Sequence, residues 1–404
     1  MESDDLNRSV WRRRLVGRFA PAYWLVLLGA LVAAWSAPRT GWDLLAYVAA
    51  AEDPWGSEPA QLQEDAYREL ALLAGEERAA VLRGEPEDAG ESRGATYRRT
   101  MAGDPEAFAA QLGFYRGRLL YLGLIRALHA AGLSLGHAVL LLSVLGGALY
   151  GAVLFLWLAR HLPGPYAPLV GAVALLVTDA SKTMAMTTPD MLAGALLVTG
   201  AWLLVELRRF LPALLVLLAA LLVRDDHALL VGALLLAGLV PASGLPQLPR
   251  SRIVLGLVLS AMVVLACRGL GEVHPPWATW RHTFVEYMAY PLAESGSADP
   301  GFALSYTLRC LPKLAGGRVA ITLILAAAAV ASGRSGGRLE PGAGLAAVAG
   351  LAWLAHFALF PAEWSRLLLP YSTLVVVGLA AVWRARGMPW TDEPAQPMSA
   401  QAAP

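Results

Sequence analysis

Long apolar runs recur along this chain, and polar segments of varying length separate them. Ten runs are candidates for membrane-spanning helices, although several are shorter than the roughly 20 residues that a helix perpendicular to the bilayer needs. The pattern predicts an all-α protein, a polytopic transmembrane helical bundle of about ten spans. The candidate spans are residues 20–37, 136–158, 165–180, 190–206, 210–223, 228–243, 252–268, 318–333, 343–360 and 367–383. The sequence RDDH interrupts residues 210–243, which are therefore either two spans meeting at the surface or one broken element.

Two polar segments are much longer than the other loops. The first, residues 38–118, directly follows the first apolar run, and apolar residues recur in it at helical spacing. Asp104 followed by Pro105 is a favourable helix start, and the basic residues mixed into the next apolar stretch suit a helix in the membrane interface. Residues 269–317 are rich in aromatic side chains, which pack at the level of lipid headgroups. We therefore predict a large outer loop of interfacial helices after the first span.

Composition supports a membrane protein. Of 404 residues, 57% are hydrophobic and only 16% are charged, against about 25% in soluble domains. The net charge of +1 gives no reason to expect a nucleic-acid partner. The basic residues are thirty arginines and two lysines, which indicates a GC-rich bacterial genome. Cys267 and Cys310 stand outside any zinc-ligand spacing, so a disulfide between them and two free thiols are both open.

Basic residues are distributed unequally between the two sides of the predicted bundle. With the N-terminus inside, the inner segments hold fourteen arginines, and the short outer loops hold only Lys182, Arg224 and Arg366. This bias places both termini in the cytoplasm of a bacterial cell, with the protein in the cytoplasmic membrane. The first span is expected to act as an uncleaved signal anchor, because Trp35 occupies the small-residue position of a cleavage site.

The predicted organisation has three parts. Residues 1–19 form a basic cytoplasmic N-terminus, and residues 20–385 form the membrane domain. Within it, residues 38–118 form a periplasmic loop with amphipathic helices. Residues 386–404 are rich in Pro and Ala, which predicts a disordered cytoplasmic tail.

Ionisable side chains at the ends of the predicted spans gather on the outer side, and such residues are often functional. Each also has a simpler interpretation. Carboxylates can be solvated helix ends or helix caps, and arginines can extend to lipid phosphates. The coincidence on one face favours a shared cavity. These outer residues are Asp43, Arg116, Arg118, Asp179, Lys182, Asp190, Arg224, Asp225, Asp226, His227, Glu363 and Arg366.

The order of these features resembles the GT-C-fold integral membrane glycosyltransferases, which use sugars carried on polyprenyl phosphates. In that superfamily, an acidic residue opens a large outer loop after the first span, as Asp43 does in GWDLLAYVAA. TTPDMLAGALLV resembles the acidic start of a later span, LLVRDDHALL an outer turn that bears an arginine, and EWSRLLLPYSTLVVVGLA the opening of a late span. The chain differs from many members in having no second acidic residue adjacent to Asp43 and no large soluble C-terminal domain.

The resemblance implies transfer of a sugar from a polyprenyl-phosphate donor to an acceptor, whose identity it leaves open, at the outer membrane face. It implies that Asp43 is the general base and that arginines bind the lipid phosphate. The implied substrate-binding residues are Arg366, Arg224, Arg116, Arg118, Asp190, Asp226, Tyr47 and Glu363. No cofactor is predicted, although some members of the superfamily use a divalent metal.

Two other function classes fit an apolar bundle. One is a transporter or flippase for a lipid or small solute, and the other is a non-catalytic membrane scaffold of the same fold. Transporters usually carry polar residues near the bilayer midplane and repeated halves. The apolar runs here are nearly free of polar residues at their centres, and no internal repeat is visible, which favours the enzyme.

Overall fold

The computed structural model describes residues 2–53, 57–85 and 93–387, with the side chains of residues 2–18 and 93 outside that description. The regular secondary structure of this part of the chain is helical apart from a short antiparallel pair, β1 (Arg334–Ser335) and β2 (Arg338–Leu339), and an isolated bridge between Arg39 and Met186. The all-α prediction is therefore confirmed. The predicted tail lies almost wholly outside the described residues, because α20 ends at Ala385 and the description at Gly387.

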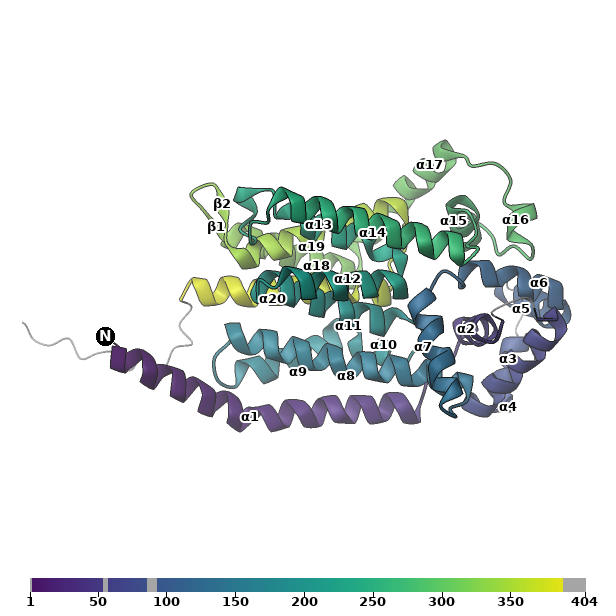
Figure 1. The fold of residues 1–404 in the computed structure, drawn as a ribbon, viewed down its shortest axis with the longest axis horizontal. Helices are drawn as coiled ribbons and strands as arrows, with labels where there is room; N and C mark the ends of the chain where they lie inside the picture. Colours follow the sequence, from purple (N-terminus) through teal and green to yellow (C-terminus); the bar gives the residue numbers. More distant parts are fainter. Residues whose placement is uncertain (1, 54–56, 86–92, 388–404) are drawn as a thin grey trace, which may run out of the picture.

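Helices that coincide with the predicted spans run roughly along the long axis of the molecule (Figure 1). They form a bundle, in which the start of the first helix and the end of the last helix lie at the same end of the molecule (Figure 1). The bundle helices are α1 (Glu2–Ser36), α8 (Leu135–His161), α9 (Tyr166–Val177), α11 (Asp190–Ala201), α12 (Phe210–Val223), α13 (Ala228–Ala237), α14 (Arg250–Leu270), α18 (Gly317–Ser332), α19 (Pro341–Leu359) and α20 (Ser365–Ala385).

The opposite end of the bundle carries a cap, which we define as the described residues of 41–130 and 275–310 (Figure 1). Its elements come from the two long polar segments and from the residues that follow the first of them. They are α2 (Trp42–Glu52), α3 (Pro59–Ala74), α4 (Glu76–Arg83), α5 (Arg93–Gly103), α6 (Pro105–Ala110), η2 (Gln111–Phe114), α7 (Leu119–Ala130), α15 (Pro276–Phe284), α16 (Pro291–Glu294) and α17 (Pro300–Cys310).

Short elements connect the longer helices. They are α10 (Ala180–Met184), the π-helical turn η3 (Trp202–Glu206), and the 3-10 turns η4 (Asp225–His227), η5 (Pro241–Ser243) and η6 (Leu311–Ala315). The stretch 210–243 is thus two helices joined by η4. The second ends at Ala237, earlier than predicted, because Pro241 cannot donate a backbone hydrogen bond and disfavours helix in the residue before it.

Five helices are long and apolar enough to cross a membrane, namely Phe19–Ser36 of α1, α8, α14, α19 and α20. A sixth crossing would combine Pro300–Ala315 with Gly317–Ser332, two helices that meet at a 76° bend. These helices make the chain an integral membrane protein. The bundle helices α9 and α12 are apolar but shorter, so length does not establish the predicted count of ten spans.

The bundle and the cap have separate apolar cores. The bundle core surrounds Trp157, Trp353 and Tyr371, and the cap core surrounds α2. Every residue of α2 from Leu44 to Ala51 is buried, so this helix is the centre of the cap. Asp43 lies in its first turn, where the helix dipole favours a carboxylate. The core of the cap therefore fixes the position of Asp43.

Candidate functional site

Asp43 meets the last bundle helix at the boundary between cap and bundle. Its Oδ2 lies 2.7 Å from Nη1 of Arg366, in the first turn of α20. The hydroxyl of Tyr115 donates to Oδ1 of Asp43 at 3.3 Å. The Arg366 guanidinium lies 5.1 Å from the centre of the Trp364 ring, within range of a cation–π contact. Asp43 is thus held from two sides.

The ion pair continues into a chain of alternating charges. Nη1 of Arg366 lies 3.7 Å from Oδ2 of Asp190, the first residue of α11. Oδ1 of Asp190 accepts a hydrogen bond from Nη1 of Arg224, which also donates from Nε and Nη2 to Asp226 at 3.1 and 2.5 Å. Four separate stretches of sequence therefore contribute to one continuous ion-pair network.

Two further arginines converge on Asp225. Nη1 of Arg118 lies 3.1 Å from one carboxylate oxygen of Asp225, and Nε of Arg268 lies 3.5 Å from the other. The convergence of these two arginines on Asp225 depends on two glycines, because a Cβ at Gly271 would lie 2.6 Å from Cα of Gly117. This close approach of two backbones brings the end of α14 against the residue before Arg118.

A cavity of about 820 Å³ lies between the cap and the bundle, and Asp43 and Arg366 adjoin it through their contacts with Tyr115 and Trp364. Arg118, Arg224, Asp225, Asp226 and Arg268 line it directly. An aromatic wall comes from the cap and the start of α20, and it comprises Phe114, Tyr115, Trp277, Trp280 and Trp364. The cavity also has an apolar side formed by α14, α17 and the end of α19, where Val264, Leu304 and Leu359 line it.

Polar atoms without hydrogen bonds gather where the cavity reaches the bundle. Nε2 of His356, which lines the cavity, has no partner among the described residues. The same holds for Nδ1 of His227 and the hydroxyl of Tyr371. All three side chains are buried, and their rings are neighbours, with centroids 6.1 Å apart for His356 and Tyr371 and 6.5 Å for His227 and Tyr371.

Burial and neighbouring charges fix the protonation of the groups outside the bundle helices. Burial alone would raise the pKa of Asp226, but Arg224, followed by His227 and Arg118, holds that pKa well below its usual range. Burial lowers the pKa of His227 to about 4, so this imidazole is neutral at pH 7. Burial likewise raises the pKa of Tyr47 to about 12. Carboxylates and guanidinium groups therefore line the cavity together with the neutral phenol of Tyr47, and the neutral imidazole of His227 follows Asp226 directly in the chain.

The structure separates the predicted site residues into two sets. Asp43, Arg118, Asp190, Arg224, Asp226 and Arg366 belong to the network or the cavity, and Tyr47 lines the cavity next to Tyr115. Arg116 instead pairs with Asp53 at 2.6 Å and with Glu272 at 3.6 Å, so its contacts lie within the cap and with the loop after α14. Glu363 is exposed and makes no hydrogen bond or ion pair within the described chain.

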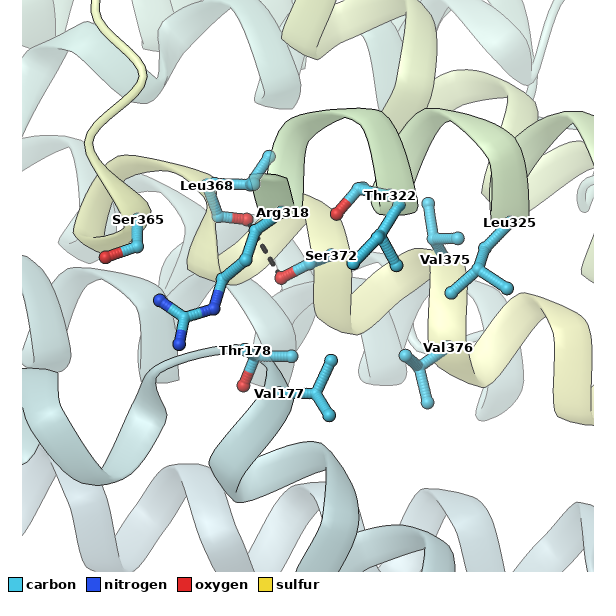
Figure 2. Close-up of a pocket in the computed structure, with 11 residues that line it drawn as sticks. Val177, Thr178, Arg318, Thr322, Leu325, Ser365, Leu368, Ser372, Val375 and Val376 are labelled. Carbon is cyan, nitrogen blue, oxygen red and sulfur yellow. Dashed lines mark hydrogen bonds between the residues drawn. The ribbon is translucent and has the colours of Figure 1, made fainter. Parts of the chain in front are cut away.

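Asp179 and Lys182 lie outside this network as well. Asp179 pairs with Arg318 of α18, and Lys182 is exposed. Arg318 lines a second, much smaller cavity of about 20 Å³ between α9, α18 and α20. Figure 2 shows its guanidinium between Ser365 and Thr178, with apolar side chains further along the helices.

Sequence reasoning missed Arg268, Tyr115, His356 and Trp364. Arg268 was counted as the last residue of a span. An arginine at the outer end of a span is unusual under the positive-inside rule, so its position was a signal of a functional role. His356 lies within a predicted span, where an ionisable residue is uncommon. Of the two alternatives for the cysteines, a disulfide or two free thiols, the structure has the free thiols, because Cys267 and Cys310 are buried and unpaired.

Among the residues that the structure describes, no group of three His, Cys, Asp or Glu side chains is arranged to hold a metal ion. Comparison with known proteins identifies no relative, since no protein-family model, curated protein or solved structure matches the chain.

Proposed function

We propose that the protein is a membrane glycosyltransferase of the GT-C type. It transfers a sugar from a polyprenyl-phosphate donor to an acceptor at the outer face of the bacterial cytoplasmic membrane. The observation that carries this proposal is the meeting of Asp43 with Arg366 and the Asp190–Arg224 pair beside a cavity that also has an apolar side. Carboxylates and guanidinium groups beside an apolar surface suit a substrate that joins a sugar, a phosphate and a long hydrocarbon chain.

The topology that we propose has ten spans and both termini in the cytoplasm. Two observations support it. Each of the ten apolar runs coincides with a bundle helix, and the two ends of the bundle chain lie at the same end of the molecule, opposite the cap. The arginine bias of the loops then assigns the cap to the outer side. Short helices such as α9 and α12 would cross where neighbouring helices and a thinner local bilayer accommodate them.

In the proposed reaction, an acceptor hydroxyl attacks the anomeric carbon of the donor sugar. Asp43 takes the hydroxyl proton as the new C–O bond forms. The bond between the anomeric carbon and the phosphate oxygen breaks, and its electron pair leaves with the lipid phosphate. Tyr115 and Arg366 hold the two oxygens of Asp43, which limits the orientations that the carboxylate can adopt.

The arginines divide into two roles. Arg224 donates to both Asp190 and Asp226, so its main role is to position those carboxylates. Arg268 makes only one long contact, at 3.5 Å, and Nε of Arg118 has no partner in the described chain. These two guanidinium groups line the cavity with donors to spare, and they suit the leaving phosphate.

The apolar side of the cavity suits the hydrocarbon chain of the donor. Leu304 of α17 and Leu359 of α19 line the cavity while 61% and 66% of their surface stays exposed. Exposed apolar patches on a protein mark surfaces that contact a membrane, a ligand or a partner. A prenyl chain could therefore enter from the bilayer along these residues while its phosphate meets Arg118 and Arg268.

The test combines the cell envelope with purified protein. Deleting the gene should remove a glycosylated envelope species detectable by mass spectrometry, and wild-type protein should restore it. The purified chain in nanodiscs should transfer the sugar that is missing from the deletion strain, supplied as its prenyl-phosphate derivative. An unchanged envelope, or net movement of lipid across vesicles without any new glycosidic bond, would contradict the proposal and favour a transporter or a scaffold.

A further inference from the structure

We propose that His356, together with His227 and Tyr371, forms a subsite for a neutral polyhydroxyl group at the bundle end of the cavity. In the reaction proposed above, on which this assignment of the occupant rests, that group is the donor sugar. The geometry that points to it is three unpaired polar atoms on three separate elements. His356 lines a cavity large enough to admit a ligand, and the rings of Tyr371 and His227 follow it into the bundle.

The unpaired atoms are the first observation. His356, His227 and Tyr371 expose 3%, 1% and 0% of their surface, yet Nε2, Nδ1 and the hydroxyl find no partner in the described chain. Buried polar groups in folded proteins are almost always hydrogen-bonded, so three unpaired ones side by side require an explanation. A ligand that brings its own donors and acceptors satisfies them.

The surroundings favour hydroxyl groups over a charged ligand. Burial keeps His227 neutral, and a neutral imidazole offers one donor and one acceptor. A tyrosine hydroxyl also donates and accepts. Asp226 lines the cavity beside them and adds an acceptor. Sugar hydroxyls both donate and accept, so they match this set, whereas a phosphate lacks donors and is better served by Arg118 and Arg268.

Aromatic groups complete the subsite. The rings of Trp353 and His356 stack at 5.5 Å with an angle of 11° between their planes, which fixes the imidazole. Phe360 lines the cavity 6.0 Å from His356 and offers an apolar face for the C–H groups of a sugar ring. The subsite thus combines hydrogen-bonding groups with an apolar surface, as ligand pockets generally do.

The experiment follows the seven histidines by NMR of the full chain, labelled at Cε1 and reconstituted in nanodiscs. The probes are octyl glucoside, octyl galactoside and octyl mannoside below their micelle concentrations, with 1-octanol as the control ligand. At least one glycoside should shift the His356 and His227 signals saturably, 1-octanol should not, and exposed His129 should stay unchanged. His356→Phe should weaken the apparent affinity by about fivefold, the loss expected for one or two hydrogen bonds, and Tyr371→Phe should act in the same direction.

Farnesyl phosphate forms a second arm that separates this subsite from the proposed reaction. If glycosides shift His356 while farnesyl phosphate fails to bind and no transfer occurs, the subsite stands and the glycosyltransferase proposal falls. If transfer occurs but no glycoside moves the His356 signal, or 1-octanol moves it equally, the subsite assignment is wrong and the reaction stands. The wild-type shifts do not depend on whether either variant folds.

Discussion

Oδ2 of Asp43 lies 2.7 Å from Nη1 of Arg366, so a single ion pair joins the first helix of the cap to the last helix of the bundle. This pairing makes Asp43→Asn a sharp test of the general base. Asn keeps the size of the side chain and an oxygen for Arg366, but it cannot take a proton. We expect transfer in nanodiscs to fall by about 10²- to 10⁴-fold, the usual contribution of a positioned base.

Glu77→Gln is the matched control for Asp43→Asn. Glu77 is an exposed carboxylate in the same cap, and it also becomes an amide. Its transfer rate should equal that of wild type, and both variants should elute as the same monodisperse species in detergent. A well-folded Asp43→Asn protein that retains wild-type turnover would remove Asp43 from the chemistry.

Arg224 is predicted to matter for stability as well as for activity. It neutralises Asp190, which is fully buried, and it binds Asp226 through two nitrogens. Arg224→Ala leaves buried charge uncompensated, and breaking such a pair costs about 3–5 kcal/mol. We expect a lowered unfolding temperature in detergent, measured by intrinsic fluorescence.

Two further variants identify the cause of that loss. Arg224→Lys should recover little stability, because an ammonium group cannot reproduce the planar set of donors. Removing the buried charge at the same time, in Arg224→Ala with Asp190→Asn, should recover part of it, since less charge is then left unpaired. If the double variant were as unstable as the sum of the two single ones, the ion pair would not be the origin of the effect.

The close approach of Gly117 and Gly271 predicts a steric effect on the site. A Cβ at Gly271 would lie 2.6 Å from Cα of Gly117 and from the carbonyl oxygen of Cys267. Gly271→Ala should therefore force the end of α14 away from the cap, at a cost of about 1–3 kcal/mol. Arg268 and Arg118 should separate, and transfer activity should fall.

Gly269→Ala provides the internal control, because nothing lies within 4 Å of a Cβ at that position. Gly269 is in the last turn of the same helix, so the change should be neutral or stabilise the helix by up to about 1 kcal/mol. Activity and unfolding temperature of both alanine variants check the prediction. Equal behaviour of the two variants would mean that the glycine contact does not position the arginines.

The helices could be predicted from the sequence because apolar runs of this length are local signals. The gathering of Asp43, Asp190, Arg224 and Arg366 at one end also followed from the predicted topology, since alternate loops share a side. Their individual roles stay predictions. Pairing could not be predicted, because Asp43 and Arg366 stand 323 positions apart and the choice of partner depends on how the helices pack.

Arg116 and Arg118 illustrate the limit of such reasoning. The two residues are neighbours in one motif, and sequence alone gave them the same role. The short turn between η2 and α7 directs them apart, so that Arg116 reaches Asp53 while Arg118 reaches Asp225 in the cavity. His356 could not be predicted for another reason. Its Nε2 atom is notable only because no group in the described chain forms a hydrogen bond with it, and this depends on how α19, α20 and η4 pack.

His227 predicts how stability depends on pH. Its pKa is about 4 in the folded protein, against 6.5 without the fold, because burial disfavours the imidazolium. Asp226 opposes this shift, whereas Arg224 and His356 reinforce it. Between these two pKa values the unfolded chain therefore binds a proton at His227 that the folded chain does not bind. The stability is complete above pH 6.5 and is lost as the pH falls toward 4, by up to about 3 kcal/mol.

Replacing the imidazole with an amide removes this titration without removing polarity. Between about pH 7 and about pH 5, the unfolding temperature of His227→Gln should fall less steeply than that of wild type. Partly buried His282, with a pKa of about 4 from burial and from nearby His274, should leave a residual slope in both proteins. Exposed His129→Gln serves as the control and should follow the wild-type curve. A His227→Gln curve parallel to that of wild type would show that the unfolded chain gains no extra proton at this position, and the assignment of a buried neutral imidazole would be wrong.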